Sequence, residues 1–279
     1  MIAELFQRNP PLAWSGAACL ALATVYLALI PFDPRTVAGV SPWIKPLKFA
    51  LSLAILAWTL AWYLDALRTQ RLFGVFTWGI VAMIGAELVP ITVQAARGVA
   101  SHFNTATPFD AAMFAFMGVA IALATILLAI VTVSFFVVET DLPAAYLWGI
   151  RLGLIIMLAA SLEGAYMSSV LRHAVGVADG GPGLPLVNWS TTGGDLRIAH
   201  FVGLHALQVL PMVGWLAGRT APRASVAVTV SAAALHAALA LALFLQALRG
   251  APMFPATPRD GRDGTPPPPQ VSGQPAETR

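Results

Sequence analysis

The residues of this chain best suited to chemistry are concentrated between Gly193 and Pro211, in a segment apolar enough to cross a membrane. Ionisable groups are costly in hydrocarbon, so they normally face the interior of a helix bundle or a water-filled space, where they often mark function. The segment therefore predicts one wall of a functional site. Its polar members are Asp195, Arg197, His200, His205 and Gln208.

Three other predicted helices carry ionisable groups at matching depth. An α-helix rises 1.5 Å per residue, so depth can be counted from the membrane face that the first, third and fifth connections share. Glu87 and Glu163 then lie about 13 Å deep, His205 about 15 Å and His236 about 18 Å. Four such groups on four helices in one layer predict that they converge, with Glu87 and Glu163 as catalytic proton-transfer groups.

The angular positions of the polar residues agree with this depth count. Helical spacing places Glu87, Gln94, Arg97 and Ser101 on one stripe. We therefore expect a polar cavity that opens on the face of the odd connections. Its predicted lining residues are Lys48, Gln94, Arg97, Ser101, Asp195, Arg197, Gln208 and His236.

Each of these residues also has a structural interpretation. Asp195 follows two glycines and precedes an apolar run, so it fits an N-cap. Arg97 and Arg197 stand near predicted helix ends, where a long side chain can reach the membrane surface. His102 and His173 fit ordinary loop positions.

A membrane-embedded metal enzyme is the first functional hypothesis. Three neutral imidazoles and a water suit a catalytic divalent metal, which predicts His102, His200 and His205 as ligands. A second ligand set would be His205 and His236 with a glutamate. Seven spans with candidate histidines are similar in architecture to the seven-helix ceramidase and adiponectin-receptor hydrolases. The five-residue spacing of His200 and His205 departs from the paired histidines of those enzymes.

Two alternatives use the same polar residues. A b-type haem or quinone protein would employ one or two axial imidazoles, for which equal depth suggests His205 and His236. A transporter or channel would use the buried Glu, His and Arg groups as a proton or anion pathway, with Pro90 and Pro211 breaking helices at useful depths. The two halves of the sequence share no motif that would indicate an inverted repeat.

The elements that must position these residues are membrane helices. Of the 279 residues, 58% are hydrophobic and only 10% are charged, and the mean hydropathy is +0.75. Only helices and closed barrels satisfy their backbone in lipid, and the alternation of barrel strands is absent. The sequence therefore predicts an all-α, polytopic membrane bundle.

Seven spans are expected in residues 1–249. A tail rich in Pro and Gly, residues 250–279, is expected to be disordered. The sixth span should be kinked at Pro211. The predicted spans are 12–31, 47–67, 72–96, 109–138, 144–171, 195–217 and 223–248.

The charge and cysteine content indicate which partners, disulfides and membrane orientation to expect. A formal charge of +3 without a basic cluster indicates contact with membrane lipid and no nucleic acid. The single cysteine, Cys19, excludes an intramolecular disulfide and is expected to pack as a small hydrophobe. Basic residues in the tight turns 68–71 and 219–223 favour a cytoplasmic N-terminus in a bacterial inner membrane. The predicted substrate is a lipid-soluble or interfacial small molecule.

Three motifs carry a family resemblance over most of residues 40–217. They are Gly193–Arg197 continuing through His200-Phe-Val-Gly-Leu-His-Ala-Leu-Gln208, then Ser101-His-Phe-Asn104, and Ser41-Pro-Trp-Ile-Lys-Pro46. Together they resemble a family of uncharacterised bacterial multi-pass membrane proteins, and the resemblance implies no activity.

Overall fold

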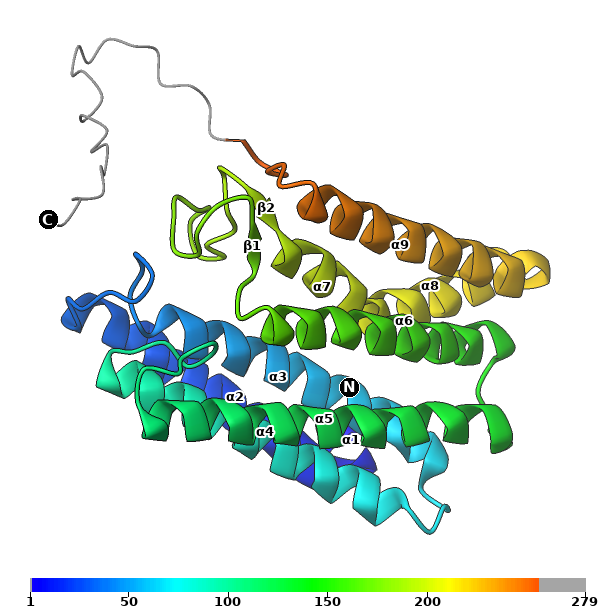
Figure 1. The fold of residues 1–279 in the computed structure, drawn as a ribbon. Helices are drawn as coiled ribbons and strands as arrows, with labels where there is room; N and C mark the ends of the chain where they lie inside the picture. Colours follow the sequence, from blue (N-terminus) through cyan, green and yellow to red (C-terminus); the bar gives the residue numbers. More distant parts are fainter. Residues whose placement is uncertain (1, 256–279) are drawn as a thin grey trace, which may run out of the picture.

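The chain folds as an all-α bundle of a multi-pass membrane protein in a computed structural model that describes residues 2–255 (Figure 1). Six helices of the described residues are long and apolar enough to cross a membrane, or up to seven if the bent pair α7–α8 counts as one span. Most of the tail predicted from residue 250 lies outside the described residues. The helices are α1 (Ile2–Arg8), α2 (Pro10–Leu29), α3 (Ile44–Leu64), α4 (Phe73–Arg97), α5 (Pro108–Val137), α6 (Ala144–Ser169), α7 (Leu196–Leu204), α8 (Ala206–Thr220) and α9 (Ser225–Leu248).

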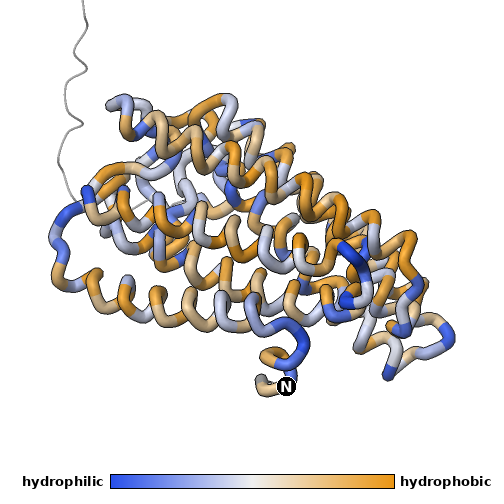
Figure 2. Tube along the Cα trace, turned by 90° about the horizontal axis from the view of Figure 1, so that it is seen from below, coloured by the Kyte–Doolittle hydropathy of each residue, from blue (hydrophilic) through white to orange (hydrophobic). Residues whose placement is uncertain are grey.

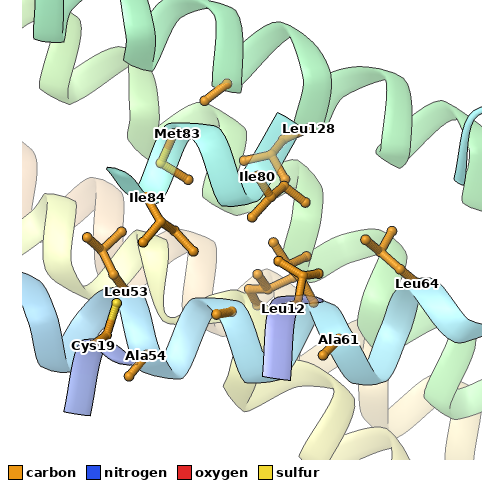
Figure 3. Close-up of a cluster of buried hydrophobic side chains, with 14 of the residues drawn as sticks. Leu12, Cys19, Leu53, Ala54, Ala61, Leu64, Ile80, Met83, Ile84 and Leu128 are labelled. Atoms are coloured by element: carbon orange, nitrogen blue, oxygen red, sulfur yellow. The ribbon is translucent and has the colours of Figure 1, made fainter. Parts of the chain in front are cut away.

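The apolar core lies among the first four spans. Leucine, isoleucine and alanine side chains of α2, α3 and α4 interdigitate there, and Leu128 of α5 closes the cluster (Figure 3). Cys19 is buried in it, as expected for a small apolar side chain. Ile150, Leu154 and Met157 of α6 join the same core, so the second half of the chain packs on the first.

Small residues bring α6 and α8 into close contact. A Cβ atom added at Gly149 would lie 2.6 Å from Leu210 O, and one at Gly153 would lie 2.8 Å from Ala206 O. Gly214 of α8 faces Ala145 O in the same way. Backbones approach this closely only where no side chain intervenes, a common arrangement for helix pairs in membranes.

The sixth span bends by 40°, and it does so at His205 instead of the predicted Pro211. Pro211 lies inside α8, where it has no N–H to donate to Leu207 O. The hydroxyl of Tyr63 on α3 donates to that carbonyl at 3.0 Å and takes the place of the missing amide. With this bond in place, Leu207 O is satisfied and Pro211 lies within α8. The span is interrupted at His205 instead, six residues before Pro211.

One end of the bundle carries the long connections and is called the loop face below. It consists of residues 33–43, 98–107, 170–195 and 249–255. Hydrophilic residues gather at the turns between helices, whereas the spans are mostly apolar (Figure 2). In the long connection, the short strands β1 (Ala174–Val175) and β2 (Gly194–Asp195) pair antiparallel. Side-chain bonds tie this connection to the rest of the face: Asn188 Nδ2 donates to Ala38 O, and Lys48 Nζ donates to Val187 O at 3.1 Å.

Candidate functional site at the loop face

The polar residues nearest the loop face are centred on Lys45, in the first turn of α3. Its ammonium group lies close enough for electrostatic interaction with Glu87 of α4, with His102 and with His173. Lys48 and Arg197 are like-charged neighbours of Lys45. We call these residues, together with Asp195, the Lys45 cluster.

Lys45 has no counter-ion within the described chain. No carboxylate oxygen of residues 2–255 forms an ion pair with its ammonium group, whose Nζ lies 6.0 Å from the centre of the Phe49 ring. The side chain is half-buried at the membrane boundary. A partly buried cation beside two other cations favours an anion at this position.

Glu87 is the carboxylic acid that interacts electrostatically with Lys45. It lies in the middle of α4 and is only 5% exposed, and its Oε1 has no hydrogen-bond partner among residues 2–255. An unsatisfied carboxyl oxygen is costly away from water. Glu87 is therefore available to a ligand or proton instead of being held by the protein.

His102 closes one side of the cluster. Its Nδ1 lies 3.2 Å from Ser101 Oγ, and its ring centre lies 5.7 Å from that of Phe49, with the two planes tilted by 55°. Burial, helped by the charge of Lys45, lowers the pKa of His102 well below its ordinary value. The ring is consequently neutral near pH 7.

Asp195 and Arg197 close the opposite side. Asp195 caps α7 by accepting from Arg197 N at 3.0 Å, which confirms its predicted role as an N-cap. Its fully buried carboxylate also pairs with the guanidinium of Arg197 at 2.6 Å. Burial alone would raise the pKa of Asp195, but the bonds and charge of Arg197 outweigh it and lower that pKa.

His173 lies between two carboxylates of the long connection. Its Nδ1 is 3.4 Å from Asp179 Oδ1 and 4.0 Å from Asp195 Oδ1, without a hydrogen bond to either. Burial and the charge of Arg197 lower the pKa of His173 to about 4. This histidine is therefore neutral near pH 7 and links the long connection to the cluster.

A second network ends α4 and begins α5. Asp110 accepts a hydrogen bond from Gln94 Nε2 at 2.8 Å, a bond from Thr107 Oγ1 at 2.7 Å and an ion pair from Arg97. Gln94 and Arg97 thus share one partner, as their common stripe suggested. These bonds join the end of α4 to the start of α5, and they therefore hold both ends of the 98–107 connection that carries His102.

The histidines of the sixth and seventh spans are each bonded to a main-chain carbonyl. His200 Nδ1 donates to Ala160 O of α6 at 2.7 Å, and His205 Nδ1 donates to Phe201 O at 2.7 Å. His236 Nε2 donates to Val202 O at 2.8 Å. The break at His205 removes the helical bond that Val202 O would accept from residue 206, so His236 satisfies a carbonyl that the bend exposes.

The remaining predicted residues occupy separate positions. Glu163 of α6 has a buried Oε2 without a partner in the described part of the chain. Gln208 of α8 donates to Thr59 Oγ1 of α3 at 3.2 Å, which joins the two halves of the bundle below the bend.

The structure does not assemble the predicted metal ligands. Within residues 2–255, no group of three or more His, Cys, Asp or Glu side chains is placed to hold a metal ion. His102, His200 and His205 therefore do not form a ligand set here, and neither do His205 and His236 with a glutamate.

Two open hollows lie at the end of the bundle opposite the loop face. One is lined by residues of the turn 69–72 together with Phe76 and Ser134, and the other by residues 136–141 together with Leu147 and Arg151. At the loop face, the predicted lining residues Lys48 and Arg197 instead contact the long connection, through Val187 O and Asn188 O. The long connection therefore covers the side chains of Lys48 and Arg197.

Sequence reasoning missed three members of the polar network. Lys45 was not predicted to line the cavity, although it stands three residues before Lys48 and so shares its helix face. Asp110 was predicted only as part of the span 109–138, without a role, and His173 as an ordinary loop histidine. The spacing Thr107-x-x-Asp110 at a helix start is the local signal for Asp110.

Comparison with known proteins gives no further assignment. No family model, curated protein or solved structure matches the chain. The family resemblance and the activity therefore stay predictions.

Proposed function

We propose that this protein is a transporter of a bacterial inner membrane that binds a small organic anion at the Lys45 cluster and moves it together with a proton carried by Glu87. The observation that carries the proposal is the pairing of Lys45, which lacks a counter-ion, with Glu87, which has an unpartnered buried oxygen. A ligand carboxylate between them would accept from the ammonium group and from a protonated Glu87.

The surrounding charges support an anion over a cation. Lys48 adds positive charge beside Lys45, while Asp195 and Arg197 neutralise each other in an ion pair. Arg and Lys groups at such a site commonly recognise carboxylates. The neutral ring of His102 adds no charge.

A proton-carrying role for Glu87 follows from its place in the membrane. Buried carboxyl groups in spans are expensive and typically serve proton relays in pumps and transporters. Loss of the proton would leave a carboxylate near Lys45, and binding of an anion would favour uptake of the proton again. Anion and proton would therefore bind cooperatively.

The bend between α7 and α8 supports the same function. Interrupted helices in transporters place free backbone groups at the site and allow the two halves to move. Here the N-terminus of α7 carries Asp195 and Arg197 at the loop face, and the break at His205 lies deeper in the bundle. A change of angle at the break would open the loop face.

Proteoliposomes containing a pH-sensitive dye test this proposal. A panel of small carboxylates applied outside should acidify the lumen with wild-type protein. Lys45→Gln should abolish this response. Glu87→Gln should abolish proton movement but retain anion binding, measured separately by calorimetry. Arg68→Gln is the matched control, because Arg68 is an exposed cation at the opposite end of the bundle.

The outcomes discriminate the competing functions. Full acidification by Glu87→Gln protein would refute the proton role, and the same carboxylate response in Lys45→Gln protein would refute the anion site. Stoichiometric metal in the purified protein with chelator-sensitive hydrolysis would favour the metal enzyme instead. A Soret band would favour the haem alternative.

A further inference from the structure

We infer that the anion bound by the Lys45 cluster is an aromatic carboxylate, an inference that rests on the proposed function and names its substrate class. The observation is a wall of aromatic rings beside Lys45. These rings come from α3, the 98–107 connection, α5 and the long connection. They belong to Phe49, His102, Phe103, Phe114 and His173.

The rings form one continuous surface. The His102 ring lies 5.7 Å from Phe49 and 6.2 Å from both Phe103 and Phe114, and Phe103 lies 5.7 Å from Phe114. Their interplanar angles range from 46° to 85°, so the rings pack on one another in tilted and edge-to-face arrangements. Aromatic pairs favour edge-to-face and offset arrangements, which a ligand ring could continue.

The wall and the cation belong to the same site. Lys45 Nζ lies 6.0 Å from the centre of the Phe49 ring, and its charge reaches His102. Four side chains of the wall are only partly buried by the protein: Phe49, His102, Phe103 and Phe114. A ligand with its carboxylate at Lys45 would therefore have its apolar part against these rings.

The chemistry of the wall distinguishes ligands. A short carboxylate such as acetate satisfies Lys45 but leaves the rings without a partner. A ring adds apolar contact and edge-to-face attraction. An amine of the same shape would be repelled by Lys45 and Lys48. The site should therefore require both the negative charge and the ring.

Calorimetry on the full-length protein in lipid nanodiscs tests the inference with benzoate, cyclohexanecarboxylate, acetate and benzamide. Benzoate should bind at least 10-fold more tightly than acetate and more tightly than cyclohexanecarboxylate, and benzamide should not compete. Phe49→Leu and Phe103→Leu should weaken benzoate at least 5-fold and leave acetate unchanged. Lys45→Gln should remove the binding of all three anions.

The outcomes separate this inference from the proposed function. Equal affinity for benzoate and acetate, with both dependent on Lys45, would overturn the aromatic assignment and leave the anion transporter intact. Equal affinity for benzoate and cyclohexanecarboxylate would likewise overturn it. If folded wild-type protein binds none of the anions, the proposed function fails and the inference fails with it. If the uncharged benzamide competed with benzoate, the requirement for a negative charge on the ligand would be refuted with the wild-type protein alone.

Discussion

The hydroxyl of Tyr63 should contribute to stability because Pro211 leaves Leu207 O without its helical donor. The hydroxyl donates to that carbonyl at 3.0 Å, and Tyr63 is 7% exposed while Leu207 is fully buried. Tyr63→Phe keeps the ring, including its edge contact with Tyr146, but leaves the carbonyl unsatisfied. We expect a loss of about 1–2 kcal/mol in the free energy of unfolding, between the values for buried orphan groups and for interhelical bonds in membranes.

A double-mutant cycle isolates this mechanism. Pro211→Ala restores a backbone N–H four residues after Leu207, so the carbonyl regains a helical donor. In that background Tyr63→Phe should cost less than about 0.5 kcal/mol. Denaturant unfolding in micelles, followed by helical circular dichroism, measures all four free energies. An equal cost of Tyr63→Phe in both backgrounds would refute the compensation.

Three further changes test the packing, the bend and the loop face. His236→Phe removes the donor to Val202 O and should destabilise the protein by about 1 kcal/mol in the same unfolding assay; an unchanged midpoint would contradict the role of His236 at the bend. Gly153→Leu forces a Cβ to within 2.8 Å of a backbone oxygen and should cost at least about 2 kcal/mol, whereas Gly118→Ala, with open space around its Cβ position, should cost nothing. The depressed pKa of His173, about 4, means that the unfolded chain binds a proton there between about pH 6.5 and pH 4 that the folded chain does not. Stability should therefore fall by about 1–3 kcal/mol as the pH drops through this window, and His173→Asn should reduce the fall; an unaltered pH profile in that variant would argue against it.

The spans could be predicted from sequence because each depends on a local property. Runs of about 20 apolar residues have one stable state in lipid, so α2 to α6 and α9 appear within a few residues of their expected bounds. The bend in the sixth span could not be located in this way. Proline predicts where a donor is missing, but the partner that compensates for Pro211 is Tyr63, 148 residues earlier in the chain.

The candidate site was predicted only in part for the same reason. Helical spacing correctly grouped Gln94 with Arg97, because both lie on one helix. The depth count placed Glu87, Glu163, His205 and His236 in one layer, but it carries no information about their direction. Equal depth is compatible with bonds to different carbonyls on different helices, and this is the arrangement of His205 and His236.

The segment from Gly193 to Pro211 joins two regions instead of forming one motif. Its first residues, Asp195 and Arg197, complete the charged surroundings of Lys45 at the loop face. Around His205, in its middle, the helix is interrupted. The Val202 carbonyl, which lacks its helical hydrogen bond there, accepts one from His236 of α9. Any change in the angle at the break must move the α7 end that carries Asp195 and Arg197, because α7 is a single helical unit of nine residues. Anion binding at Lys45 and the angle of the sixth span should therefore be thermodynamically linked. Removing the hydrogen bond from His236 to Val202 O should then change the affinity for the anion, although His236 does not contact the anion.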